Sequence, residues 1–165
     1  MTDSTNADAK RLPDIVLVCP EIPHNTGAIG RLCVGLGCRL HLIRPLGFRL
    51  DEKSIRRCGL DYWEHLGVQV HDNWGAYLAA ARPARLLFLS THGEKSLYSV
   101  RFAPDDTLVF GSESAGLPAS FYADYRDSLF RIPMPGEHAR SINLANAVSI
   151  AAYEAFRQLD GALGK

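Results

Sequence analysis

The chain has 165 residues, of which 47% are hydrophobic and 22% charged, and eighteen basic residues balance eighteen acidic ones. These values are typical of one globular domain with a sizeable core. The balanced charge excludes a protein that binds nucleic acids or anionic membranes through its overall charge, so such binding would need a local patch. No apolar run approaches the roughly 20 residues that cross a bilayer, and the sequence therefore predicts no contact with a membrane.

Predicted strands and helices alternate along most of the chain. Apolar runs bounded by Pro, Gly or polar residues indicate strands, and apolar residues at helical spacing indicate helices. In chain order the elements are a strand at 14–20, a helix at 25–37, a strand at 39–45, a helix at 51–63, a strand at 68–72, a helix at 73–81 with Asn73 as its N-cap, a strand at 85–91, a polar loop, a strand at 107–112, a short helix near 118–125, a strand at 129–134 and a long helix from 141 to near 161. This alternation predicts a single α/β domain over residues 13–161, with a mainly parallel six-stranded sheet and helices on both faces.

The four cysteines and the polar start of the chain indicate a compartment rather than a metal site. Cys19, Cys33, Cys38 and Cys58 form no CxxC pair, and no histidines cluster around them, whereas structural zinc sites use such pairs. The first twelve residues are polar and lack the apolar core of an export signal. We therefore expect a disordered leader over residues 1–12 and a cytoplasmic protein with reduced thiols and no metal.

Three loops follow strands at the edge of the sheet where ligands bind in folds of this kind. They are PEIPHNTG after the first strand, GSESAGLP after the fifth and PMPGEHARS after the sixth. These loops lack the GxGxxG fingerprint of dinucleotide-binding proteins, the Walker phosphate loop and the GxSxG turn of hydrolases. They indicate a ligand site, but they disfavour an ordinary Rossmann enzyme and a serine hydrolase.

Polar residues in these loops allow structural as well as functional interpretations. Gly111 can form a tight strand-to-helix turn, or it can bring a ligand close to the backbone. Arg31 lies among apolar residues of the first helix, where it can extend to the surface or grip a phosphate. Ser141 is suited to capping the last helix, but this leaves Asn143 and Asn146, which are poor helix formers, unexplained.

One segment of the chain is locally basic. Between residues 39 and 57, arginine and lysine outnumber aspartate and glutamate by four, and the basic residues include Arg49, Arg56 and Arg57. A solvated helix face explains this surplus as well as an RNA-binding patch does. Because phosphate contacts dominate affinity for RNA, the segment is nevertheless the candidate RNA-binding surface of an otherwise neutral chain.

Together the three loops resemble the motifs of the SPOUT superfamily of RNA methyltransferases, in its minimal single-domain 2′-O-methyltransferase branch. The motifs are PEIPHNTGAIGRLC, LVFGSESAGLP and IPMPGEHARSINLANAVSIAAYEAFRQ. RLHLIRPLGF and RRCGLDYW also resemble the branch that modifies the wobble nucleotide of tRNA. The resemblance covers residues 14 to 159, and three motifs in the same order make it specific.

The resemblance implies a C-terminal trefoil knot, a homodimer, and the cofactor S-adenosylmethionine bound against the knot. The residues that match the cofactor-binding positions are Leu89, Gly111, Ile132, Met134, Ser141 and Leu144. In the family, the first and last helices of the domain form the dimer interface.

The resemblance also implies a catalytic set of Arg31, Asn143 and Ser141, in which Arg31 lies at the reacting ribose. An arginine loses its proton only above pH about 12, so holding the ribose or its phosphate suits Arg31 better than removing a proton. Glu113 and Asn25 are further polar motif residues, suited to orienting the hydroxyl and the cofactor.

For RNA binding we expect Arg31, Arg56 and Arg57, with the homodimer bringing the basic segment of one subunit beside the other's cofactor site. Without a separate RNA-binding domain, the target would be a small exposed one, such as the tRNA anticodon loop. The sequence thus predicts an S-adenosylmethionine-dependent tRNA 2′-O-methyltransferase acting on the wobble cytidine or 5-substituted uridine. The alternatives are a non-catalytic RNA-binding module of the same fold and a methyltransferase of ribosomal RNA. His24, where close relatives would carry proline, is interpreted as a loop variant or as a group that titrates near the site.

Overall fold

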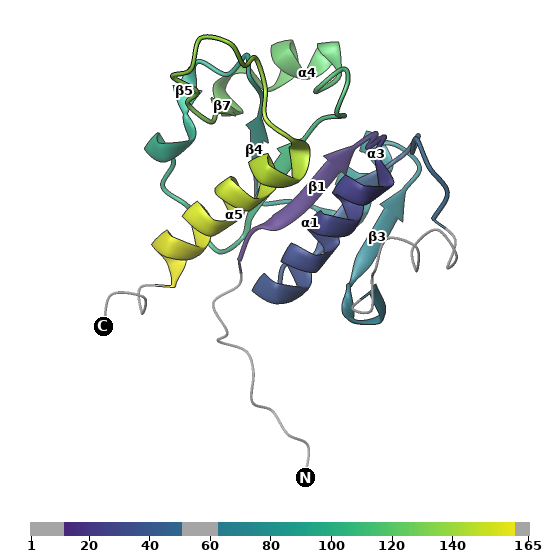
Figure 1. Cartoon of the computed structure of the whole chain (residues 1–165). Coiled ribbons are helices and arrows are strands. Elements are labelled where there is room, and N and C mark those ends of the chain that lie inside the picture. Colours follow the sequence, from purple (N-terminus) through teal and green to yellow (C-terminus); the bar gives the residue numbers. More distant parts are fainter. Residues whose placement is uncertain (1–11, 51–62, 161–165) are drawn as a thin grey trace.

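The computed structural model describes residues 12–50 and 63–160, and within these ranges it contains one sheet of seven strands (Figure 1). The strands are β1 (Asp14–Val18), β2 (Leu40–Ile43), β3 (Val68–His71), β4 (Arg85–Leu89), β5 (Lys95–Ser96), β6 (Asp106–Phe110) and β7 (Leu129–Arg131). Their order in space is β3-β2-β1-β6-β4-β7-β5, and every neighbouring pair is parallel. The chain builds outward from β1 first in one direction and then in the other, and such a reversal leaves a crevice at the carboxyl ends of the strands.

The prediction of six strands was wrong by one. The six predicted strands all occur, each somewhat shorter than expected, and β5 is the additional strand. It consists of Lys95 and Ser96 alone and pairs with Phe130 and Arg131 of β7. Two polar residues carry no alternation of apolar side chains, so only the pairing with β7 makes this segment a strand.

Helices connect the strands in the predicted order. They are α1 (Pro23–Leu36), α3 (Trp74–Ala81), α4 (Ala119–Asp124) and α5 (Leu144–Leu159), with short 3-10 turns η1 (Trp63–His65), η2 (Leu97–Ser99) and η3 (Arg126–Ser128). Asn73 caps α3 as predicted, since its side chain accepts a hydrogen bond from the Ala76 N–H at 2.8 Å. Of the helix predicted over 51–63, residues 51–62 lie outside the described ranges, and Trp63 is the first residue of η1. Among the described residues, no helix has both the length and the apolar character needed to cross a membrane.

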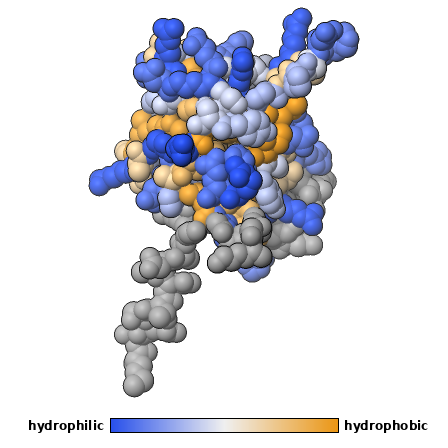
Figure 2. All heavy atoms as spheres, turned by 90° about the vertical axis from the view of Figure 1, so that its left-hand side faces the viewer, coloured by the Kyte–Doolittle hydropathy of each residue, from blue (hydrophilic) through white to orange (hydrophobic). Residues whose placement is uncertain are grey.

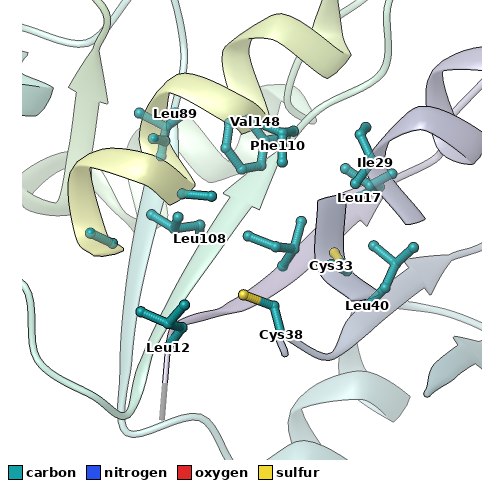
Figure 3. Close-up of a cluster of buried hydrophobic side chains, with 14 of the residues drawn as sticks. Leu12, Leu17, Ile29, Cys33, Cys38, Leu40, Leu89, Leu108, Phe110 and Val148 are labelled. Atoms are coloured by element: carbon teal, nitrogen blue, oxygen red, sulfur yellow. The ribbon is translucent and has the colours of Figure 1, made fainter. Parts of the chain in front are cut away.

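Helices cover both faces of the sheet, as predicted, and each face has its own apolar cluster. One cluster joins α1 and α5 to inward residues of β1, β2, β4 and β6 (Figure 3): it includes Leu17, Ile29, Cys33, Leu40, Leu108, Phe110 and Val148. The other joins α3 and α4 to the opposite face and includes Val16, Tyr77, Phe88, Val109 and Phe121. Ala151 and Ala155 of α5 are fully buried, and their small side chains let α5 pack closely against its neighbours. Leu12, the last residue of the expected leader, is buried in the first cluster, and residues 1–11 lie outside the described ranges.

A polar pair is buried beneath α3. The Nδ1 atom of His41 lies 3.1 Å from Nε2 of His71, and the ring of Tyr77 meets both imidazoles edge to face. Burial, and to a lesser extent the neighbouring His41, lower the pKa of His71. His71 is therefore held in its neutral form, which suits a hydrogen bond between two imidazoles.

Acid–arginine pairs close the amino end of the sheet. Asp14 accepts hydrogen bonds from Arg39. Asp106, which is only 2% exposed, accepts from Arg85 at 2.6 and 2.5 Å and from the Ala103 N–H at 2.7 Å. A buried carboxylate needs such partners, because an unpaired charge in the interior is strongly destabilising. These pairs lie at the ends of the strands opposite to the three motif loops, and so they belong to the scaffold rather than to a site.

Candidate functional site

A cavity of about 590 Å³ opens at the carboxyl ends of β4, β6 and β7. It is lined by Ile22, Asn25, Leu89, Ser90, Thr91, His92, Phe110, Gly111, Ser112, Glu113, Ser114, Ala115, Gly116, Leu117, Tyr122, Ile132, Met134, Arg140, Ser141, Ile142, Asn143, Leu144 and Ala147. The carboxyl ends of parallel strands share one edge of the sheet, so residues from all three motif loops meet in this cavity.

All six residues matched to the cofactor-binding positions line the cavity. Leu89 ends β4, Ile132 follows β7, and Leu144 is the first residue of α5. All three also pack on the apolar cluster between α1, α5 and the sheet, which holds them in place. The cavity thus combines an apolar wall with polar loop residues, a combination typical of small-molecule sites.

The end of β6 folds back so tightly that only glycine fits at Gly111. A Cβ atom there would lie 2.0 Å from the carbonyl carbon of Gly116 and 2.2 Å from the nitrogen of Leu117. The Ser112 N–H donates to the Gly116 carbonyl at 3.0 Å and the Gly116 N–H to the Ser112 carbonyl at 2.9 Å, while Gly116 has the positive φ of 70° that favours glycine. The interpretation of Gly111 as part of a tight turn is confirmed, and this turn lines the cavity. The approach of a ligand to its backbone stays a prediction.

Glu113 joins the second motif loop to the first. Its Oε2 accepts a hydrogen bond from the Glu21 N–H at 2.7 Å, and its Oε1 accepts from the Ile22 N–H and from Nδ2 of Asn25, each at 3.1 Å. These donors lie at the N-terminus of α1, where the backbone N–H groups favour a negative charge. The carboxylate of Glu113 therefore fixes the first loop against the second.

Asn143 extends this link to the third loop. Its Nδ2 donates to Oδ1 of Asn25 at 2.9 Å, and its Oδ1 accepts from the Ala145 N–H at 2.8 Å. Asn143 rather than Ser141 thus caps α5, and the prediction of Ser141 as the cap was wrong. A continuous chain from Glu113 through Asn25 to Asn143 connects all three motif loops.

Some predicted residues lie away from the cavity. Arg31 is on α1, about 9 Å further along the helix than Asn25 at 1.5 Å per residue, and it is exposed and does not line the cavity. His24 is also exposed and outside the lining. Arg56 and Arg57 lie outside the described residues, so the predicted RNA-binding segment is not placed relative to the cavity.

Glu21 contributes to the site although sequence reasoning did not select it. Its Oε1 accepts a hydrogen bond from Oγ of Ser114 at 2.6 Å, and its Oε2 accepts from the Ser114 N–H at 3.1 Å. The partner lies 93 residues away in the sequence, so the only local signal was the position of Glu21 inside the first motif.

A second cluster that the sequence did not indicate lines the cavity beside β4. Oγ of Ser90 lies 3.0 Å from the hydroxyl of Tyr122, and the His92 ring meets Tyr122 edge to face at 5.7 Å. Ser90 belongs to the end of the strand predicted over 85–91, His92 to the polar loop that follows it, and Tyr122 to a predicted helix without a motif. They add polar groups to the lining of the cavity.

The described cysteines are free thiols. Burial, and then the Glu21 carboxylate, raise the pKa of Cys19, and burial with the charge of Asp14 raises the pKa of Cys38 to about 12. Both thiols are therefore protonated at neutral pH, which makes them poor nucleophiles. Over residues 12–50 and 63–160, no group of three or more His, Cys, Asp and Glu side chains is arranged to hold a metal ion.

Residues 14–153 match the profile of a known family, described as the SpoU rRNA Methylase family. The chain belongs to this family. The matched range begins at the first residue of β1 and extends into α5, so it contains all three motif loops and the cavity between them.

Relatives of this SpoU methylase cover nearly the whole chain. A protein of Saccharophagus degradans named tRNA (cytidine(34)-2'-O)-methyltransferase is 51% identical over 148 residues, which are 88% of this chain and 95% of the relative. A solved structure described as giving structural insights into the 2-OH methylation of C/U34 on tRNA is 48% identical, with a TM-score of 0.85 over 93% of this chain and 99% of its own. The SpoU methyltransferase AviRb from Streptomyces viridochromogenes, in complex with the cofactor AdoMet, is 26% identical, with a TM-score of 0.78 over 94% of this chain and 63% of its own.

Proposed function

We propose that this SpoU methylase transfers a methyl group from S-adenosylmethionine to the ribose 2′-hydroxyl of the wobble nucleotide of tRNA, a cytidine or a 5-substituted uridine. The observation that carries the proposal is the meeting of the three motif loops at one cavity, in a chain whose half-identical relative is named for methylation of cytidine 34. The anticodon loop suits a compact protein, because its bases are single-stranded and can be splayed out for recognition.

The residues at the cavity fit S-adenosylmethionine. The volume of about 590 Å³ is within the range of small-molecule sites, and the related AviRb structure contains AdoMet. Backbone groups around Ile132, Met134 and Leu144 would receive the adenine, while Leu89 and the turn that begins at Gly111 would line the rest of the cofactor site. When bound, the cofactor supplies an electrophilic methyl group on its sulfonium sulfur.

Asn143 and Ser141 would orient the ribose hydroxyl. The amide of Asn143 is held on one side by Asn25 and on the other by the backbone of α5, so its position is fixed before any ligand binds. Ser141 lines the cavity without serving as the helix cap, and its hydroxyl remains available to a ligand. Fixed partners of this kind accelerate a transfer reaction mainly by holding the reacting groups in line.

Arg31 would hold the ribose or its phosphate as a permanent cation. Because it lies outside the cavity of its own chain, a homodimer would supply it to the cavity of the partner. Figure 2 shows apolar side chains across the middle of the face on the side of β5 and the C-terminal part of α5. Tyr153 of α5 is 54% exposed and Ile142, just before α5, is 38% exposed. These exposed residues on and just before the helix support an interface between two copies that includes α5.

A trefoil knot would complete the fold. β7 lies between β4 and β5, two strands that both precede it in the chain. The Ser90 N–H donates to the Phe130 carbonyl at 2.9 Å, and a Cβ atom on Gly93 would lie 2.5 Å from the Phe130 carbonyl carbon. The segment after β4 therefore passes directly against β7, which supports a C-terminal segment threaded through an earlier loop.

The proposed tRNA substrate and the free thiols of the described cysteines support a cytoplasmic location.

Incubation with labelled S-adenosylmethionine tests the function. Unmodified tRNA should acquire label on a ribose of the anticodon loop, and ribosomal RNA, the substrate class in the family's description, should acquire none. Label on a base, or none on any tRNA, would contradict the proposal, and label on ribosomal RNA alone would favour the second candidate, a ribosomal RNA methyltransferase. A calorimetric titration without cofactor binding would instead indicate a non-catalytic RNA-binding module.

The Arg31→Ala variant separates RNA positioning from cofactor binding. We expect turnover to be lost while the affinity for S-adenosylmethionine stays near that of the wild type, because Arg31 does not line the cavity. A comparable loss of both would show that Arg31 supports the cavity or the fold. Arg101→Ala, on an exposed arginine that also lies outside the cavity lining, is the matched control.

A further inference from the structure

Two carboxylates cross in opposite directions between the loop after β1 and the turn after β6. Glu113 of the turn accepts hydrogen bonds from the N–H groups of Glu21 and Ile22, at 2.7 and 3.1 Å. In return, Glu21 of the loop accepts two hydrogen bonds from Ser114, at 2.6 and 3.1 Å. Each segment therefore supplies one acid and hydrogen-bond donors for the other acid.

The backbone of Glu21 is fixed from its other side. The Gly47 N–H donates to the carbonyl of Pro20 at 2.9 Å, and a Cβ atom on Gly47 would lie 2.7 Å from the Cα of Glu21. Cys19, two residues earlier, has a positive φ of 52°, and its N–H donates to the Ile43 carbonyl at 2.9 Å. The loop after β2 thus supports Glu21 from behind, while its side chain reaches forward to Ser114.

The turn that Glu21 holds is part of the cavity. Ser112, Glu113, Ser114 and Gly116 all line it. Ser114 follows Glu113 directly, so a shift of Ser114 moves the carboxylate that binds Asn25. Asn25 in turn holds Asn143 at the start of α5. The contacts of Glu21 therefore act on the cofactor wall and on the proposed catalytic amide together.

We propose that Glu21 is a positioning residue whose carboxylate holds Ser114, so that the turn over residues 112–116 keeps the geometry that binds S-adenosylmethionine. This inference rests on the proposed function. Glu21 itself does not line the cavity, so it acts through Ser114 and not by contact with the cofactor. Two charge-assisted hydrogen bonds to one residue are strong enough to select a single position of an exposed turn.

Calorimetric titration of S-adenosylmethionine into the full chain and its variants tests this role. Glu21→Ala should weaken the cofactor about tenfold, the equivalent of one charge-assisted hydrogen bond. Glu21→Gln should recover most of the affinity, because its amide oxygen can accept from the Ser114 N–H while its amide nitrogen donates to the Ser114 hydroxyl. Asp105→Ala, which removes an exposed carboxylate just before the amino end of β6, is the control and should bind as the wild type does.

A double-mutant cycle identifies the path of the effect. If Glu21 acts through Ser114, the combined Glu21→Ala and Ser114→Ala changes should weaken binding less than the product of the two single effects. Urea unfolding of each variant, with titrations under conditions where all are folded, excludes a loss of folded protein as the cause.

Four results would overturn the inference. A Glu21→Ala variant that is folded and binds within about twofold of the wild type would show that Ser114 needs no support. Multiplicative effects in the cycle, or a Glu21→Gln variant as weak as Glu21→Ala, would show that Glu21 acts by a route other than its hydrogen bonds to Ser114. A wild-type chain that binds no S-adenosylmethionine would overturn the proposed function together with this role, whereas the first three results leave the proposed function intact.

Discussion

Replacing Gly111 by alanine should distort the turn that lines the cavity. The added Cβ would lie 2.0 Å from the carbonyl carbon of Gly116, whereas non-bonded carbons prefer about 3.5–4.0 Å. The turn must therefore open by roughly 1.5 Å or more, and the two backbone hydrogen bonds between Ser112 and Gly116 would be lost at about 1 kcal/mol each. With overpacking strain of about 1–3 kcal/mol, we expect the free energy of unfolding to fall by about 3–5 kcal/mol.

Urea unfolding measures this loss, and calorimetry at a temperature where the variant is folded measures its affinity for S-adenosylmethionine, which should fall at least about tenfold. Gly35→Ala is the matched control. Nothing lies within 4 Å of a Cβ at this position of α1, so the change should stabilise the helix by about 0.5 kcal/mol and leave binding unchanged. A Gly111→Ala variant with wild-type stability and wild-type affinity would refute the close contact between Gly111 and Gly116.

The remaining predictions concern the scaffold. Asn73→Ala removes the cap of α3 and should cost about 1 kcal/mol in urea unfolding without changing cofactor affinity; an unchanged midpoint would contradict the capping bond. The pKa of His71 is lowered in the folded chain, so its imidazole binds a proton more readily in the unfolded chain. The free energy of unfolding should therefore decrease as the pH falls below about 6.5, by at most about 1.4 kcal/mol per pH unit. A His71→Gln variant should lose this contribution, and an identical pH profile would refute it. Asp106→Ala should cost about 2 kcal/mol because it removes the hydrogen bonds that Arg85 and the Ala103 N–H donate to a buried carboxylate, whereas Asp72→Ala, in an exposed pair with Arg44, should cost less than about 0.5 kcal/mol. Equal losses would contradict the difference in burial.

The alternation of strands and helices could be predicted from the sequence, because each strand core is an apolar run and the helices have apolar residues at helical spacing. The cap of α5 could not, since Ser141 and Asn143 both have the chemistry of a cap and lie two residues apart. The choice depends on Asn25, which binds Asn143 from 118 residues away. The capping preference of a residue depends on its neighbours in the sequence, so it cannot account for a hydrogen-bond partner that only the fold brings near.

The same limit explains the other differences. β5 has two residues, too few for any period, and exists because β7 lies beside it. Glu21 and Ser114 are separated by 93 residues, and although each lies inside a motif, nothing in the sequence pairs them. The six cofactor positions were found because they follow family motifs, and all of them line the cavity, although their contact with the cofactor stays a proposal. Arg56 and Arg57 remain predictions, because they lie outside the described residues.

Nucleoside mass spectrometry of tRNA from cells that lack this chain tests the proposed function most directly. We expect the 2′-O-methylated nucleoside at the wobble position to disappear, and to return with the wild-type chain but not with Arg31→Ala. Wobble nucleosides that keep their ribose methyl group in the absence of the chain would contradict the proposed function.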